Sequence, residues 1–140
     1  MPTTNAVEPT PEQIEAFLGS HEDGVPVYML NLLKFKPTST YREGEQTSGE
    51  DAYRRYAAAF GEMLREQGIE GTQTVFGGKV DRFLIGAGED EWDAVAIVRY
   101  PDKKTMFEAV SCEAYRSFHF HRKAGLEGQL LIACDGSGVF

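Results

Sequence analysis

The fold is decided by the stretch at residues 92–100, which reads WDAVAIVRY. Its central run, from Ala94 to Val98, is continuously apolar, and such a run predicts a strand that is covered on both faces. A second stretch at residues 27–35, VYMLNLLKF, has the same character, with Asn31 as the one uncharged polar side chain among its alternating apolar residues. A sheet built around these two strands needs a cover for each of its faces.

Working outward from these strands, helical and strand patterns alternate along the chain. Capping residues and glycines bound the helical segments, and turn residues bound the strands. In chain order, the sequence predicts a helix over 11–18, a strand over 27–35, a helix over 48–67, strands over 72–80, 83–85 and 92–100, helical pieces over 102–111 and on to 123, and a strand over 130–134.

This order is βαββαβ preceded by an N-terminal helix, which is the pattern of an α+β, ferredoxin-like fold with an antiparallel sheet. We expect an extension with a short helix at residues 1–24, the ferredoxin-like domain at 25–134 and a loose tail at 135–140. Helices cover one sheet face, so the other would be an exposed apolar patch in a monomer. The sequence therefore predicts a homodimer that pairs two sheets as a dimeric α/β barrel.

Composition narrows the classes of partner and location. The 140 residues fit one domain, and their net charge of −8 opposes binding to nucleic acid or to anionic membranes. The start is not a signal peptide and the apolar runs are too short to cross a bilayer, so we expect a cytoplasmic protein. Cys112 and Cys134 are predicted to be reduced, and the acidic run at 89–93 lacks the spacing of a metal loop. We therefore expect no metal.

Several short motifs together carry a family resemblance. They are Trp92-Asp93-Ala94, Arg99-Tyr100-Pro101, Phe107, Tyr115, His121-Arg122 and Leu126, extended by Tyr28 to Leu33, Tyr53, Tyr56 and Gly77-Gly78. On these motifs the chain resembles a bacterial domain-of-unknown-function family, number thirteen-thirty, of the dimeric α/β-barrel superfamily. The resemblance implies a pocket between sheet and helices and no known cofactor. Related families include cofactor-free quinol monooxygenases, lactone isomerases, haem-degrading enzymes and plain ligand binders, so it implies a fold and not a reaction.

The strongest candidate site lies on the last helical segment. Tyr115, His119 and Arg122 fall at i, i+4 and i+7, so they share one helix face. There Arg122 is a candidate anchor for a small carboxylate or phenolate. The alternative is that Arg122 pairs with an acidic side chain and fixes the helix end. His119 and His121 point in opposite directions, and either is a candidate general base: His119 shares the face of Arg122, whereas His121 fits the family motif.

Three further residues are weaker candidates. Asn31 is predicted to orient a ligand or an oxyanion, unless its amide only bonds within the sheet. Tyr53 has core spacing, with a hydroxyl that could reach a pocket rim and contact substrate. Trp92 is a candidate substrate contact, with packing against a helix or a dimer partner as the alternative. Gly77 and Gly78 predict a bulge or bend in their strand.

Two functions fit these residues. The favoured one is a cofactor-independent enzyme of the oxygenase or isomerase type that acts on an apolar oxygenated metabolite. The alternative is a non-catalytic ligand-binding or assembly module, and a haem-binding protein is a distant third because no axial histidine is clearly placed. A perturbed histidine pKa in a closed pocket would indicate the enzyme. A barrel filled by Met29, Phe35, Phe76 and Phe83 would indicate the module.

Overall fold

A four-stranded antiparallel sheet organises the computed structural model, which describes residues 6–136 apart from the side chain of Glu89. The strand order is β2-β3-β1-β4, so the two doubly apolar strands lie at the centre as expected. The strands are β1 (Val27–Phe35), β2 (Gln73–Lys79), β3 (Ala94–Tyr100) and β4 (Leu126–Asp135). The expected α+β, ferredoxin-like fold is confirmed.

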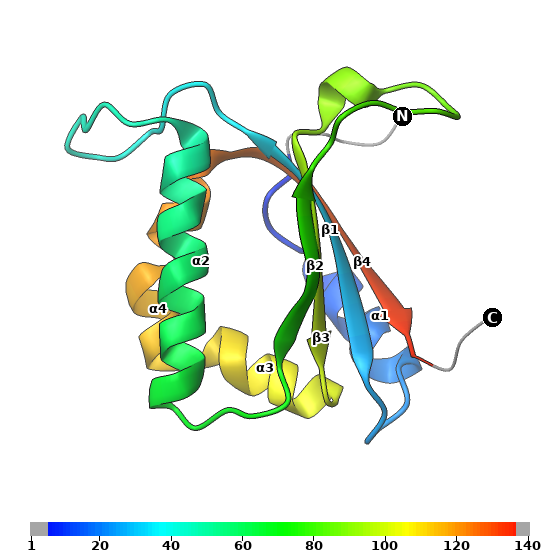
Figure 1. Cartoon of the computed structure of the whole chain (residues 1–140). Helices are drawn as coiled ribbons and strands as arrows, with labels where there is room; N and C mark the ends of the chain where they lie inside the picture. The colour runs from blue at the N-terminus through cyan, green and yellow to red at the C-terminus, as the bar shows by residue number, and fades with distance from the viewer. Residues whose placement is uncertain (1–5, 137–140) are drawn as a thin grey trace.

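Helices cover one face of this sheet (Figure 1). They are α2 (Gly49–Glu66), α3 (Lys103–Ser111), α4 (Glu113–Phe118) and α5 (Phe120–Gly125). Alternate residues of β1, beginning with Val27 and Met29, point to these helices and are buried against Met63, Tyr115 and Phe118. Because the side chains of a strand alternate between faces, the residues between them point to the opposite face, which no helix within residues 6–136 covers.

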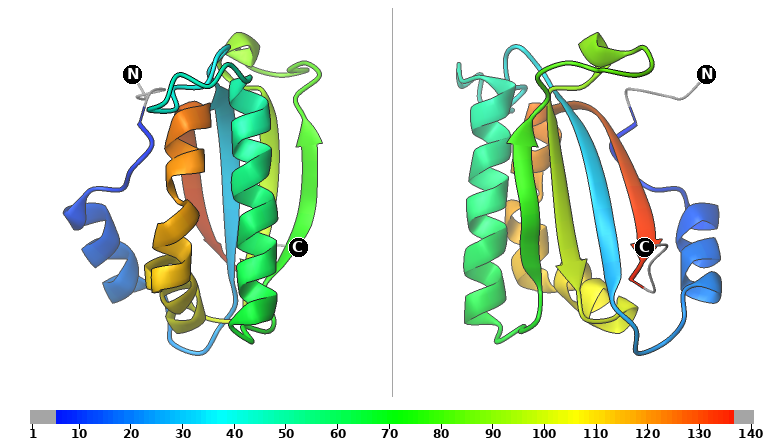
Figure 2. Two further views of the ribbon diagram at one scale, coloured as in Figure 1. Left: turned by 90° about the vertical axis from the view of Figure 1, so that its left-hand side faces the viewer. Right: turned by 45° about the vertical axis from the view of Figure 1, so that its right-hand side comes forward.

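The N-terminal helix α1 (Pro11–Ser20) is the expected extra helix. It begins with the predicted capping box, in which Thr10 and Gln13 bond reciprocally. Figure 2 shows α1 on the opposite flank of the molecule from α2. The Lys103 ammonium of α3 fastens it by donating to the carbonyls of Leu18 and His21, each at 2.6 Å.

Three local expectations are wrong. Residues 83–85 form no strand: Lys79 already pairs with Ala94, the first residue of β3, so the chain beyond has no strand to pair with. The irregularity in β2 falls between Thr74 and Phe76, whereas Gly77 and Gly78 keep regular pairing. The last strand begins at Leu126, four residues before the predicted start at 130, because α5 passes directly into β4.

Two smaller features follow from the sequence. Cys112 and Cys134 are free thiols, as predicted. Among the helices within residues 6–136, none has the length and apolar character needed to cross a membrane.

Candidate functional site

A chain of hydrogen bonds links the sheet to the last helix through buried polar side chains. The amide of Asn31, on β1, donates to the carbonyls of Met29 and Ala96, each at 3.2 Å. Its oxygen accepts from Gln129 Nε2, on β4, at 2.8 Å, and the oxygen of Gln129 accepts from Arg122 at 2.6 Å. Arg122 is only 9% exposed. The sheet therefore holds one edge of this guanidinium in a fixed position.

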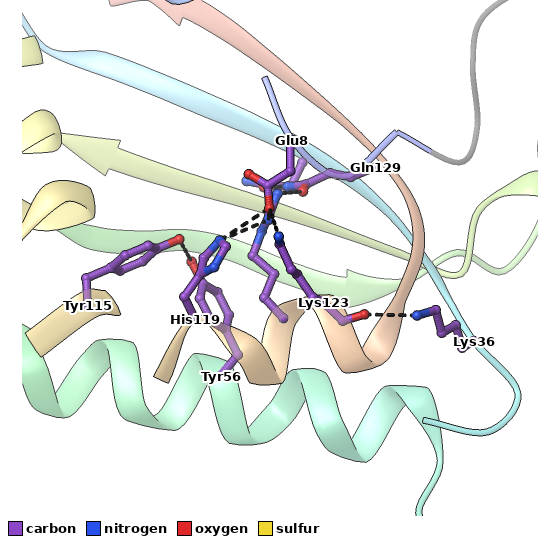
Figure 3. Close-up of polar contacts among 9 residues, drawn as sticks. Glu8, Lys36, Tyr56, Tyr115, His119, Lys123 and Gln129 are labelled. Carbon is purple, nitrogen blue, oxygen red and sulfur yellow. Dashed lines mark hydrogen bonds and ion pairs between the residues drawn. The ribbon is translucent and has the colours of Figure 1, made fainter. Parts of the chain in front are cut away.

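The other edge of the guanidinium faces a cluster that includes Glu8, from the segment before α1 (Figure 3). Arg122 Nη1 lies 3.5 Å from His119 Nε2 and 3.4 Å from Glu8 Oε1. The same oxygen of Glu8 lies 3.5 Å from His119 Nε2 and 3.5 Å from Lys123 Nζ. We call Arg122 and Lys123, together with the adjacent imidazole of His119, the cationic cluster, because the first two residues carry its positive charge. It forms a local positive site on a chain of net charge −8.

Three tyrosines extend the site along the helices. The Tyr56 and Tyr115 hydroxyls are 3.0 Å apart, and the Tyr115 and His119 rings are 5.4 Å apart. Burial raises the pKa of Tyr53 to about 12, although the charge of Arg122 acts in the opposite direction. Burial also raises the pKa of Tyr56 and of Tyr115. These phenols therefore stay protonated near neutral pH and can donate hydrogen bonds.

His119 has an environment that favours the neutral imidazole. Burial is the main cause of its lowered pKa, and the charges of Arg122 and Lys123 act in the same direction, whereas Glu8 opposes them. A neutral imidazole can accept a proton near pH 7. His119 is therefore a neutral imidazole beside a fixed cation.

His121 lies apart from this cluster. Its Nδ1 is 2.7 Å from the hydroxyl of Tyr41, on the wall of an open hollow of about 1130 Å³. Glu8 and Lys123 also line this hollow, so it opens onto the outer end of the cationic cluster. The structure thus brings His119 together with Arg122 and Tyr115, and puts His121 elsewhere.

Trp92 is the other predicted site residue that lies apart. It is 7% exposed, just before β3, and borders a smaller hollow with Lys34 and Lys79. Asn31 is linked to Arg122 through Gln129, whereas the ring of Tyr53 packs against Phe35 and Tyr56. Within residues 6–136, no group of histidine, cysteine or acidic side chains has the arrangement of a metal site.

Sequence reasoning missed Gln129, Lys123 and Glu8. Gln129 precedes the predicted start of the last strand, so its position beside Asn31 was not visible. Lys123 was treated only as the end of a helical segment. Glu8 lies in the extension that was set apart from the domain, and nothing in its surroundings signals a site.

These features define a class of protein: a ferredoxin-like α+β domain with a sheet-anchored arginine beside a neutral histidine. Within that class, the chain is 30% identical to the RPA0582 protein, over 98% of each chain and with a TM-score of 0.85. A second structure of that protein, from Rhodopseudomonas palustris, is described as having unknown function. The chain belongs to the same family as RPA0582.

More distant structures share only the fold. A hydroxynitrile lyase from Passiflora edulis is 8% identical, with 84% of this chain and 98% of that chain covered and a TM-score of 0.58. A candidate antibiotic biosynthesis monooxygenase from Caulobacter crescentus CB15 is 10% identical, with 88% and 99% covered and a TM-score of 0.52. No curated protein matches in sequence. No family model matches either, so the numbered family of the sequence resemblance is not confirmed.

Proposed function

We propose that this protein is a cofactor-independent enzyme of the isomerase or oxygenase type, which binds an apolar oxygenated metabolite through a carboxylate or phenolate. The single observation that carries the proposal is the neutral His119 held 3.5 Å from the buried guanidinium of Arg122. A base beside a fixed cation suits proton abstraction that leaves negative charge on a substrate oxygen.

The chemical step assigns one role to each group. His119 Nε2 takes a proton from the substrate, and the electron pair left behind moves onto a substrate oxygen as an enolate or phenolate. Arg122 stabilises that charge, and the protonated phenol of Tyr115, on the preceding helix α4, is a donor whose ring lies beside that of His119. Returning the proton to a different carbon completes an isomerisation. In an oxygenase, the substrate carbanion would instead react with molecular oxygen, the resulting peroxide would take the proton back from His119, and loss of water would leave a new carbonyl group on that carbon.

Asn31 and Gln129 are positioning residues in this scheme. The Asn31 amide is engaged by two backbone carbonyls and by Gln129, so it acts on the site through Gln129. Gln129 in turn fixes Arg122. This arrangement pre-orders the guanidinium before any ligand arrives, which lowers the cost of binding.

One observation expected for the non-catalytic module, a barrel interior that Phe76 helps to fill, is not found. That module required Phe76 to fill the interior, yet Phe76 pairs with Ile97 on the uncovered face of the sheet and is 56% exposed. The lowered pKa of His119 supports the enzyme, whereas the hollow that the structure shows nearby is open and is lined by His121. Trp92 and His121 lie apart from Arg122, so neither takes part in the proposed step.

The uncovered sheet face supports a homodimer. One row of cross-strand neighbours runs Phe76, Ile97, Leu30 and Ile132 across all four strands. Phe76 and Ile132 at its ends are 56% and 43% exposed. Apolar residues that continue across a whole sheet mark an association surface, and we propose that a second copy covers it as in a dimeric α/β barrel. A cytoplasmic location and the absence of nucleic-acid binding remain predictions from sequence and charge.

The test begins with a thermal-melt screen of small carboxylates and phenols. Stabilisation of the wild type should be lost in Arg122→Met and kept in Arg116→Met, a control at an exposed arginine of α4. Arg122→Met itself should cost about 1–3 kcal/mol, because buried Gln129 Oε1 loses its donor. The acidic partner, Glu8, is 44% exposed, so no buried carboxylate is stranded.

Catalysis is then tested on the compounds that bind. Incubation in heavy water without added cofactor should place deuterium at a carbon next to a carbonyl group, as followed by NMR. His119→Gln should slow this exchange by about a hundredfold or more. Binding without exchange would establish the non-catalytic module, and a wild type that binds no compound would contradict the proposed site.

A further inference from the structure

One carboxylate of the chain itself already lies at the cationic cluster. Glu8 Oε1 is 3.4 Å from Arg122, 3.5 Å from His119 and 3.5 Å from Lys123 (Figure 3). Charge-assisted N–H···O bonds are normally about 2.7–2.9 Å long. Three groups thus converge on a single oxygen, and none of them holds it at the length of a strong bond.

The segment that carries Glu8 is attached to the sheet through a backbone hydrogen bond. We call residues 6–9 the strap. Its Ala6 carbonyl accepts a hydrogen bond of 2.8 Å from the backbone N–H of Gln129, on the open edge of β4. Glu8 precedes Pro9, which favours an extended backbone, and α1 begins two residues further on at Pro11. Gln129 is therefore bonded to the strap by its backbone and to Arg122 by its side chain.

Both the local charge and the exposure of Glu8 allow a ligand carboxylate to replace the Glu8 carboxylate. Arg122 and Lys123 supply two positive charges against the single charge of Glu8, since His119 is neutral. The Glu8 side chain is 44% exposed and borders the open hollow, whereas Arg122 is buried. A ligand that enters from the hollow meets Glu8 first, and its own carboxylate can pair with the same two cations, Arg122 and Lys123.

We propose that Glu8 occupies the anion position of the ligand, and that a small monocarboxylate binds by displacing the strap. The inference rests on the proposed function, because it takes Arg122 as the anion anchor. It adds the ligand class, the place of the ligand carboxylate at Glu8 Oε1, and an internal competitor that every ligand must replace.

The experiment compares the wild type with Glu8→Gln, which keeps the shape and removes the charge. Glu15→Gln, at an exposed position of α1, is the matched control. Benzoate is the probe, and its binding is followed through the ring signals of His119 by NMR. If the strap is closed in about nine tenths of the molecules, its release raises the apparent affinity about tenfold. Glu8→Gln should show this gain, and Glu15→Gln should match the wild type.

A second readout follows the strap directly. The Gln129 amide should exchange its hydrogen faster in Glu8→Gln than in the wild type, because its partner Ala6 is released. Benzoate added to the wild type should speed the same exchange.

The experiment distinguishes a failure of the strap proposal from a failure of the anion site itself. Equal benzoate affinity in Glu8→Gln and wild type, lost in both on Arg122→Met, would overturn the strap and leave the anion site standing. Weaker affinity in Glu8→Gln would overturn it too, by making Glu8 part of the ligand site. If benzoate binds to none of the variants, the anion site fails and the strap proposal falls with it.

Discussion

His119 and His121 are two residues apart, yet their surroundings give them different chemistry. His119 faces Arg122, Lys123 and Glu8, while His121 bonds to Tyr41 and lies near Arg55 and Glu45. Burial is the leading cause of the lowered pKa of both rings, and nearby arginines add to it. The helical offset explains the separation, since residues two apart project from opposite faces.

The lowered pKa of His119 predicts a pH dependence of stability. In the unfolded chain its pKa is near the ordinary value of 6.5, so between that value and the lower folded pKa the unfolded state binds more protons. Stability is therefore full above pH 6.5 and is lost as the pH falls below it. The melting temperature should drop between about pH 7.5 and about pH 5.5, and less steeply in His119→Gln.

His121→Gln is the companion variant for this measurement, because the pKa of His121 is lowered as well. His121→Gln should make the dependence of the melting temperature on pH less steep, independently of His119→Gln. The double variant should show both reductions together. A slope identical in the wild type and all three variants would contradict the environment described for these rings.

The contact between α2 and α5 depends on two glycines. A Cβ on Gly125 would lie 2.4 Å from the Gly49 carbonyl oxygen, and one on Gly49 would lie 2.6 Å from the Gly125 carbonyl oxygen. Neither glycine has a positive φ, so the constraint is space and not backbone conformation. Gly125 also accepts a hydrogen bond from the Lys36 backbone N–H, which ties the end of β1 to this contact. The close approach fixes the end of α5 against α2. It thereby positions Arg122 of α5 near Gln129 of β4.

Gly125→Ala should therefore destabilise the protein by about 1–3 kcal/mol or more, since the obstructing atoms are backbone. The matched control is Gly61→Ala on α2, where an added Cβ meets nothing closer than 4.0 Å. That control should gain about 0.5–1 kcal/mol, because alanine is the better helix former. Urea unfolding of both variants measures the difference, and equal effects would show that the contact tolerates a side chain.

The molecule as a whole has one covered and one uncovered sheet face. Helices bury the sheet face to which Met29 points. The opposite face, which carries the row from Phe76 to Ile132, has no cover within residues 6–136. The β2–β3 connection adds to this apolar exposure, because Leu84 and Ile85 are 90% and 94% exposed. Figure 1 shows this connection reaching away from the helices, toward the side of the uncovered face. A second copy stacked on the sheet would bury both features.

Light scattering should accordingly give about twice 15.6 kDa down to low micromolar concentration. Ile132→Glu puts a charge into the apolar row of the proposed contact, at its β4 end, and should produce monomers. Leu18→Glu is the control, because Leu18 is 41% exposed on α1 against 43% for Ile132. A wild type that stays monomeric would contradict the proposed barrel.

The sequence by itself determined the element order, the two central strands and the covered-face pattern, because these depend on local periodicity and on capping residues. It also placed Tyr115, His119 and Arg122 together, since one helical face decides their spacing. It could not place the start of β4, because the polar stretch 127–129 interrupts the apolar pattern after Gly125 and its place beside β1 is visible only in the sheet register.

Tertiary structure alone decided what Arg122 touches. Gln129 and Glu8 are 7 and 114 residues from Arg122 along the chain, one on a neighbouring strand and the other in the N-terminal extension. No periodic pattern relates such positions, because strand register and strap pairing bring them together only after the sheet has formed. The different partners of the two histidines, Arg122 for His119 and Tyr41 for His121, likewise depend on tertiary contacts.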